Sequence, residues 1–214
     1  MRSLHVASTF SHLAASESWA FDDFTEKQID NFEELSIQIE TNLGYNISRH
    51  ILNSAGIERF PDKQFNMVRL GIGLYGVSAS GVSGLRNVCT LKTTILQIKT
   101  LKVNDTVGYG LKEVLDHDAR VATIRIGYAD GLSRQFGNRK GRVLINGVIA
   151  PIIGDVCMDL CMVDVTNIKA SEGDSVTVFG ENLSVVELAK SINTIPYEIL
   201  TSVSPRVKRV YIKE

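Results

Sequence analysis

Apolar residues recur with two different rhythms along the chain. In the first 86 residues, apolar runs of strand length alternate with longer stretches of helical periodicity. Residues 4–10 and 47–52 are predicted strands, and Asp22-Asp23 offers an N-cap for a helix over residues 24–43 that ends at Gly44. Its predicted apolar face is made of residues at helical spacing: Phe24, Phe32, Leu35, Ile39 and Leu43.

The rest of this first part continues the alternation of strand and helix. A short helical piece follows residue 53, and residues 67–70 form an apolar run that predicts a buried strand. The glycine-rich stretch 71–76 comes directly after it. Such βα units favour a parallel sheet or a barrel.

From about residue 88 the pattern changes to short strands separated by turns. Strands are predicted at 90–103, 119–126, 142–153, 163–165, 176–179 and 207–212, and Asn146-Gly147 marks a hairpin inside the third. A helix is predicted to start at Ser184, with Glu187 completing a capping box, and another to span 197–203. We therefore predict a partial α/β domain over residues 1–86, with a parallel sheet or part of a barrel, followed by a mostly-β domain over residues 87–214.

Composition and charge exclude several classes of protein. The 214 residues include 23 Lys+Arg and 24 Asp+Glu, which gives a net charge of −1. This balance does not indicate binding to nucleic acid or to an anionic membrane, since either would favour an excess of basic residues. No apolar run approaches the roughly 20 residues of a membrane-spanning helix, and the N-terminus lacks a secretion signal, so a cytoplasmic location is expected. Three cysteines suit reduced thiols better than a disulfide framework or a zinc site.

Five segments carry candidate chemistry. Tyr128 stands between glycines at the end of an apolar strand, a position that by itself is typical of an ordinary rim residue. The string Gly154-Asp155-Val156-Cys157-Met158-Asp159 is unusual, and so is Arg69-Leu70-Gly71-Ile72-Gly73. With residues 10–14 around His12 and residues 197–200 beginning at Tyr197, these segments occur in a fixed order. Five motifs in order are far more specific than any one of them.

Taken together, these motifs resemble the ordered signature of bacterial alanine racemases from about residue 3 to residue 211. The resemblance implies a (β/α)8 barrel that holds pyridoxal 5′-phosphate, and a homodimer in which the β domain lends a tyrosine to the partner subunit. Tyr128 matches that tyrosine, the base that removes the α-proton of L-alanine. Met158 matches a residue whose backbone contacts the substrate.

The resemblance also implies the residues around the cofactor. Arg69 matches the arginine that faces the pyridine nitrogen, and His12 matches a histidine hydrogen-bonded between that arginine and the tyrosine. The positions around the cofactor phosphate are matched by Asn53, Ser54, Gly71, Ile72 and Tyr197.

These matches make physical sense, although each residue also has a plainer interpretation. An arginine keeps its proton at neutral pH, so a pyridine nitrogen facing Arg69 would stay largely unprotonated, which weakens the electron sink and limits transamination. Tyr128 would need its pKa lowered by roughly two to three units from about 10 to act as a base, partly through His12 and Arg69. The plainer interpretations are a structural ion pair for Arg69, a satisfied histidine for His12 and simple turns for the glycines.

The segment that would carry the Schiff-base lysine is not found in the sequence. The only Lys-Ala pair is Lys169-Ala170, in a predicted turn. A (β/α)8 barrel takes about 250 residues, so we expect these residues to be a piece of a longer polypeptide, for example a proteolytic fragment or part of a fusion with a cell-wall ligase. We expect the uncovered barrel remnant to self-associate or to be partly disordered.

The leading hypothesis is therefore part of an enzyme that interconverts L- and D-alanine for peptidoglycan synthesis, with the isolated chain inactive. Two alternatives stay open: a racemase of serine or another small amino acid, and a noncatalytic module for dimerisation or attachment.

Overall fold

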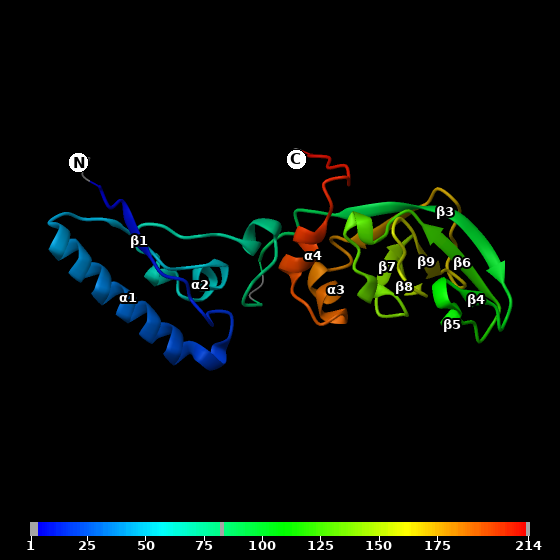
Figure 1. The fold of residues 1–214 in the computed structure, drawn as a ribbon, viewed down its shortest axis with the longest axis horizontal. Helices are drawn as coiled ribbons and strands as arrows, with labels where there is room; N and C mark the ends of the chain where they lie inside the picture. Colours follow the sequence, from blue (N-terminus) through cyan, green and yellow to red (C-terminus); the bar gives the residue numbers. More distant parts are fainter. Residues whose placement is uncertain (1–3, 82–83, 213–214) are drawn as a thin grey trace. The chain divides into compact units, whose positions relative to one another are not determined.

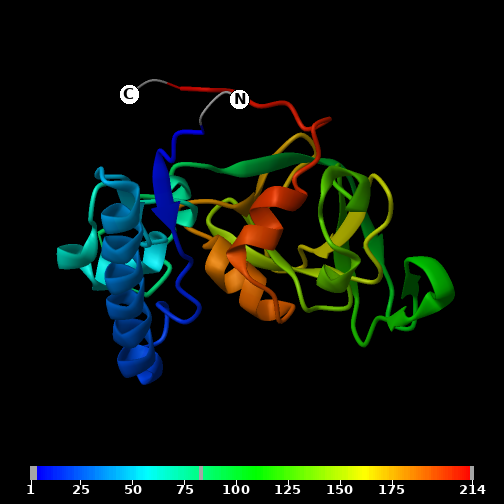
Figure 2. The same ribbon diagram turned by 60° about the vertical axis from the view of Figure 1, so that its left-hand side comes forward.

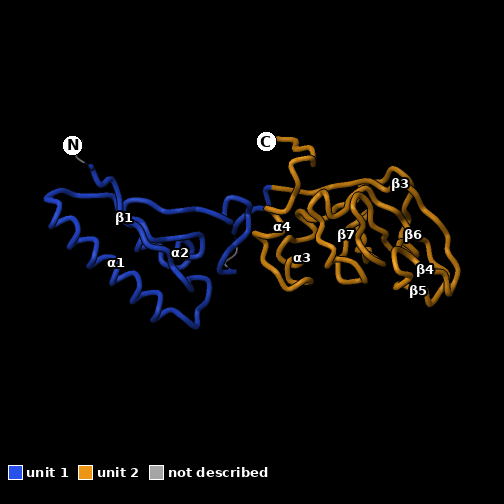
Figure 3. Tube along the Cα trace, in the orientation of Figure 1, with its two compact units in different colours: residues 1–88 blue, residues 89–214 orange. Residues whose placement is uncertain are grey.

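The computed structural model describes residues 4–81 and 84–212, and the chain divides into two compact units, Met1–Val88 and Cys89–Glu214 (Figure 3). The first holds the partial barrel and the second a mostly-β domain, as the sequence predicts. No helix in the described residues is long and apolar enough to cross a membrane.

The first unit is built on one βαβ element. Strand β1 (Ser8–Phe10) pairs in parallel with β2 (Ser48–His50), and α1 (Asp22–Leu43) connects them (Figure 1). The short helix α2 (Ser54–Arg59) follows β2, and three single-turn 3₁₀ helices complete the unit: η1 (Trp19–Phe21), η2 (Pro61–Lys63) and η3 (Ile72–Tyr75). Both predicted strands therefore exist, but each is only three residues long.

The predicted start of α1 was wrong, and its predicted apolar face was right for Phe32 but wrong for most of the other residues. Asp22 and Asp23 lie inside the first turn, where their charges favour the helix N-terminus, and Phe21 occupies the N-cap. The buried residues are Thr25, Ile29, Phe32 and Ser36, whereas Phe24, Leu35 and Ile39 are exposed. The helix thus buries a stripe that includes two hydroxyl residues, and the Ser36 hydroxyl is accommodated there because it donates to the carbonyl of Phe32 at 2.6 Å. The predicted C-terminal glycine is confirmed: Gly44 has φ +75°.

Residues 67–70 do not form the predicted buried strand. Met67 and Leu70 are each 47% exposed, and the segment is extended without a strand ladder. One backbone hydrogen bond, from Arg69 N to Leu52 O at 3.0 Å, lays it beside the chain that follows β2.

The second unit is a closed six-stranded barrel with strand order β10-β3-β6-β9-β8-β7 (Figures 1 and 2). Its strands are β3 (Leu91–Leu101), β6 (Ala119–Ile124), β7 (Arg142–Ile145), β8 (Val148–Ile153), β9 (Cys161–Asp164) and β10 (Ser175–Phe179). All neighbouring strands in it are antiparallel. A small antiparallel pair, β4 (Thr106–Val107) with β5 (Glu113–Val114), is inserted between β3 and β6.

The turns and helices of this unit lie close to the positions that the sequence predicts. Asn146 and Gly147 have φ of +49° and +80° and join β7 to β8, as an Asn-Gly hairpin requires. Helices α3 (Val185–Ser191) and α4 (Pro196–Ser202) lie where they were predicted. The Ser184 side chain caps Val186 N, so the predicted capping box with Glu187 is not the contact formed. The predicted strand at 207–212 is absent from its described residues.

Candidate active site

The best-defined polar cluster of the first unit surrounds Arg69. Its guanidinium donates to the backbone carbonyls of Ser11 (2.7 Å), His50 (3.1 Å) and Ile51 (3.1 Å), so that it ties together the chain ends that follow β1 and β2. It also lies 3.4 Å from His12 Nδ1, and over the ring of Phe10 at 5.5 Å. Thus the predicted contact between His12 and Arg69 exists.

His50 is a member of this cluster that the sequence did not single out. Its Nδ1 lies 2.7 Å from Arg69 Nη1, and its ring stacks on Phe10. Burial and the neighbouring charge of Arg69 both lower the pKa of His50. A neutral imidazole can accept a hydrogen bond at Nδ1, so Arg69 is held by an acceptor that carries no negative charge.

Among the described residues, no carboxylate contacts Arg69, and the structural ion pair considered for it is therefore not formed. Among the described contacts, the cation is balanced by carbonyl dipoles, imidazoles and the Phe10 ring. Partial burial lowers its pKa somewhat, but an arginine starts from so high a value that it stays charged at neutral pH.

Ser54 and the glycine-rich segment form a second cluster. Ser54 Oγ accepts from the amides of Gly71 (2.8 Å) and Gly73 (3.4 Å), while Asn53 caps α2 by accepting from Gly56 N at 2.9 Å. Because the Ser54 oxygen accepts hydrogen bonds from these two amides, the hydroxyl proton of Ser54 can be donated in another direction. Ile72 is buried and starts η3. The structure thus brings four of the predicted phosphate residues into one neighbourhood, namely Asn53, Ser54, Gly71 and Ile72.

Tyr128 and Met158 lie on two joined loops of the second unit. Tyr128 starts the 3₁₀ helix η5 (Tyr128–Asp130), and its amide donates to Cys157 O at 2.9 Å, while Ala129 N donates to Met158 O at 3.0 Å. Both side chains are exposed, 44% for Tyr128 and 54% for Met158. The structure therefore brings these two predicted residues together and presents both to the outside of the barrel.

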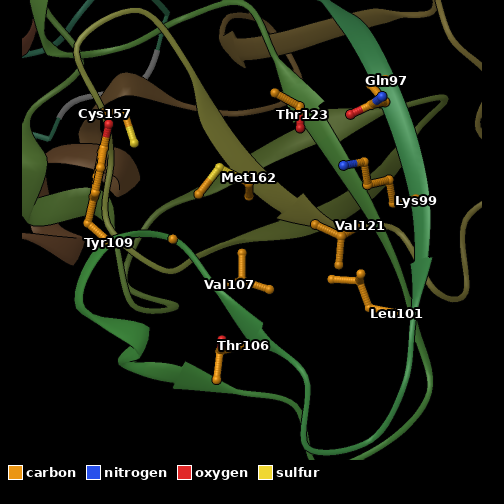
Figure 4. Close-up of a pocket in the computed structure, with 11 residues that line it drawn as sticks. Gln97, Lys99, Leu101, Thr106, Val107, Tyr109, Val121, Thr123, Cys157 and Met162 are labelled. Atoms are coloured by element: carbon orange, nitrogen blue, oxygen red, sulfur yellow. The ribbon is translucent and has the colours of Figure 1, made fainter.

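Tyr109 is a second exposed tyrosine of this region, and it was not among the residues predicted from the sequence. It starts η4 (Tyr109–Leu111) between Gly108 (φ +82°) and Gly110 (φ +71°), and it is 75% exposed. Its side chain extends toward Cys157 along a cavity of about 450 Å³ that Met162 also lines (Figure 4). The flanking glycines were the available signal, the same one that drew attention to Tyr128.

Tyr197 is the remaining predicted site residue. It is the second residue of α4, its side chain is 44% exposed, and its carbonyl accepts from the Thr201 hydroxyl at 2.7 Å. Its role at a phosphate stays a prediction.

The two parts of the chain match the models of two domains of one protein family. Residues 88–211 match the family described as alanine racemase, C-terminal domain, and residues 1–79 match alanine racemase, N-terminal domain. The chain belongs to the alanine racemase family. Alanine racemase 1 of Clostridium acetobutylicum is 37% identical over 97% of the chain and 56% of its own length, and the alanine racemase of Helicobacter pylori strain P12 is 36% identical over 99% and 59%. The chain thus spans somewhat more than half the length of these relatives.

Solved alanine racemases share the fold. The enzyme of Streptomyces coelicolor superposes with a TM-score of 0.91 at 30% identity, covering 98% of this chain and 57% of that one. The enzyme of Bartonella henselae, solved with covalently bound pyridoxal phosphate, gives a TM-score of 0.87 at 34% identity over 96% and 56%.

Proposed function

We propose that these residues are part of an alanine racemase that uses pyridoxal 5′-phosphate, and that Arg69 and Ser54 are its cofactor residues. The observation that carries the proposal is the cationic Arg69 cluster, which contains no carboxylate among its described contacts. An aminotransferase would be expected to place a carboxylate at the pyridine nitrogen instead. When bound, the cofactor supplies an electron sink that makes the α-proton of an amino acid removable.

The residues present fit such a cofactor. A phosphate needs hydroxyl and amide donors with close backbone approach, and Ser54 with the amides of segment 71–73 has that chemistry. Arg69 is held from several sides by carbonyls and His50, so its guanidinium has a fixed orientation and remains a donor. Its role is to keep its own proton, and thereby to leave the ring nitrogen opposite unprotonated.

We further propose that a tyrosine of the second unit removes the α-proton of L-alanine. The sequence predicts Tyr128 for this role, and Tyr109 competes for it. Tyr109 is supported by its greater exposure, by its direction along the cavity toward Cys157, and by its place in a backbone with three left-handed residues, Gly108, Gly110 and Leu111 (φ +52°). Glycine adopts a positive φ without strain, but Leu111 does not, and backbone strain of that kind is concentrated at functional sites. Of the two, we therefore favour Tyr109.

The other parts of the proposal concern the whole protein. A second base on the opposite face, the lysine of the family resemblance, is not found in this sequence, so residues 1–214 alone are expected to be inactive. The exposed Tyr109, Tyr128 and Met158 suit a site completed by a partner subunit in a homodimer. The product D-alanine would serve peptidoglycan synthesis in the cytoplasm.

A chimera tests the activity. The chain replaces the matching part of the Clostridium acetobutylicum relative, and interconversion of L- and D-alanine is measured with pyridoxal phosphate added, beside residues 1–214 alone. We expect activity only in the chimera. A folded chimera without racemisation contradicts the proposed function, and faster turnover of L-serine than of L-alanine favours the serine alternative. A chimera that dimerises without binding the cofactor favours the noncatalytic module.

The same chimera distinguishes the two tyrosines. Tyr109→Phe should lower kcat from L-alanine by at least about 100-fold, the usual size of a lost general base, and Tyr128→Phe by much less. Tyr211→Phe, which alters a 90% exposed side chain, is the matched control. The reverse order of the first two effects would assign the base to Tyr128, as the sequence predicts.

A further inference from the structure

Arg206 joins the two loops that carry Tyr128 and Met158. Its Nε lies 2.7 Å from Asp130 Oδ1 and its Nη2 lies 2.6 Å from Asp159 Oδ1. Asp130 ends η5, two residues after Tyr128, and Asp159 directly follows Met158. One guanidinium thus bridges two carboxylates from segments that are about 30 residues apart in sequence.

The bridge reinforces contacts that the loops already make. The backbone bonds from Tyr128 N to Cys157 O and from Ala129 N to Met158 O join the same two loops. Asp130 also accepts from Gly127 N at 2.9 Å through its second oxygen, so its carboxylate fixes the start of η5 as well as the bridge. The guanidinium thus forms an ion pair with a carboxylate on each side of the joint.

The segment before Arg206 fastens it to the Tyr128 loop. Ser204 N donates to Asp130 O at 3.0 Å, and the Ser202 hydroxyl donates to Gly131 O at 2.9 Å. Gly131 has φ +104°, and a Cβ there would lie 2.2 Å from Ser202 O, so only glycine allows this approach. The guanidinium is therefore delivered from a backbone that is itself anchored next to η5.

A cavity of about 360 Å³ beside the bridge is lined by Arg125, Asp130, Asp159 and Arg206. Asp130 and Asp159 are both engaged by Arg206, so the charges that line this space are largely used within the protein. This arrangement suits a positioning role better than a ligand site.

We propose that Arg206 is a positioning residue that sets the Tyr128 and Met158 loops at the substrate side of the proposed racemase. It acts through Asp130 and Asp159 and touches neither substrate nor cofactor. Its kinetic consequence rests on the proposed function, but its effect on the loops does not.

Hydrogen exchange on residues 1–214 tests the effect on the loops. Arg206→Ala should raise the exchange rates of the Tyr128 and Ala129 amides at least about tenfold, because each donates across the joint. Arg209→Ala is the matched control, since Arg209 donates to the carbonyls of its own segment, those of Val203, Ser204 and Val207. Asp159→Asn removes one arm of the bridge with little change of volume, and should give a smaller increase.

The chimera tests the kinetic consequence. Arg206→Ala should lower kcat by roughly tenfold, and by no more than Tyr128→Phe does, because the loops that Arg206 holds carry Tyr128 and Met158 and not the favoured base Tyr109. The primary deuterium isotope effect from L-alanine should change, which a merely structural role would not cause, and Arg206→Lys should restore part of kcat.

The outcomes separate the two proposals. Unchanged exchange at Tyr128 and Ala129 in both Arg206→Ala and Asp159→Asn overturns the positioning role, whatever the kinetics. Increased exchange with unchanged kcat in an active chimera also overturns it. An inactive wild-type chimera contradicts the racemase proposal, while the exchange result still decides whether Arg206 holds the loops.

Discussion

At the scale of single residues, Gly127 shows how closely the Tyr128 and Met158 loops approach each other. Its φ of −149° is open to any residue, so its conformation does not explain the glycine. A Cβ at this position, however, would lie 2.3 Å from both Cys157 O and Met158 O. Since both contacts are to backbone, no rotamer change can relieve them. The absence of a side chain is what lets the Tyr128 loop dock.

Gly127→Ala should therefore destabilise the second unit by about 1–3 kcal/mol, the usual cost of overpacking. Urea unfolding followed by far-UV circular dichroism measures it. Gly147→Ala is the control, because Gly147 has φ +80° and open space around it, so the substitution adds backbone strain without a clash. Equal exchange rates at Tyr128 N in wild type and Gly127→Ala would show that the loops dock without this close approach.

The sequence identified part of this site because some residues are informative by type. Arg69 stands in an apolar run and Ser54 stands two residues before Gly56, and the structure places both in polar clusters. His50 does not stand out, since it is simply the last residue of a short strand, and the glycines that flank Tyr109 do not by themselves distinguish a site tyrosine from a tyrosine in an ordinary turn. Their importance arises from which segments the fold brings together, and no local pattern records that.

At the scale of elements, Asp155 links three segments near the cavity of Tyr109. Its carboxylate lies 3.2 Å from Nζ of Lys112, the residue that follows η4, and 3.4 Å from Nη2 of Arg134, the first residue of η6 (Arg134–Phe136). It also accepts a hydrogen bond from Nδ2 of Asn138, in the turn after η6, at 3.0 Å. Hydrogen bonds from Asn138 and Lys112 lower the pKa of Asp155 below its ordinary value. The carboxylate is thus favoured in the folded state.

Asp155→Asn should be less stable than wild type at neutral pH. A group whose pKa is lowered on folding contributes stability above its unfolded pKa and loses it as the pH falls through the folded value. The stability difference between the variant and wild type should therefore be largest above about pH 4–5, near the unfolded pKa of an aspartate. It should become smaller as the pH falls below that range. Thermal unfolding of both proteins across that range measures the difference. A deficit that does not vary with pH would contradict the role of the charge.

The barrel strands give a sharper test of packing. On β8, Ile152 is fully buried while Ile149 is 45% exposed. Ile152→Ala should cost about 2–5 kcal/mol, because it removes transfer free energy and leaves a cavity. Ile149→Ala, the same change on the same strand, should cost well under half as much. Similar losses in urea unfolding would contradict the assigned faces.

Elements of the second unit could be predicted well because their signals are local. The Asn146-Gly147 turn fixes the β7–β8 register, and the strands on either side have clear apolar patterns. The face of α1 and the segment 67–70 could not be predicted, because their burial depends on partners far away in the sequence. Ser36 can be buried by bonding to Phe32 O, and Met67 can be exposed, without any change in local pattern.

At the scale of the whole molecule, the two units differ in how they are held together. The barrel of the second unit is closed, so its six strands have no free edge. The sheet of the first unit has two strands of three residues, which is too small for much independent stability. That unit also exposes large apolar side chains: Phe10, Trp19, Phe21, Phe24 and Leu74. We therefore expect the first unit to unfold first and to drive self-association.

Trp19 allows the two transitions to be separated. It is the only tryptophan of the chain, and it lies in the first unit with the Arg59 guanidinium 3.8 Å from its ring centre. In urea, its fluorescence should therefore change at lower concentration than the circular dichroism of the barrel. Ile152→Ala should shift the second transition and leave the first in place, because Ile152 is a fully buried residue of the barrel strand β8. Sedimentation of residues 1–214 should depend on concentration, and that of residues 89–214 much less. Coincident transitions that Ile152→Ala moves together would instead show one cooperative molecule, in which the barrel stabilises the first unit.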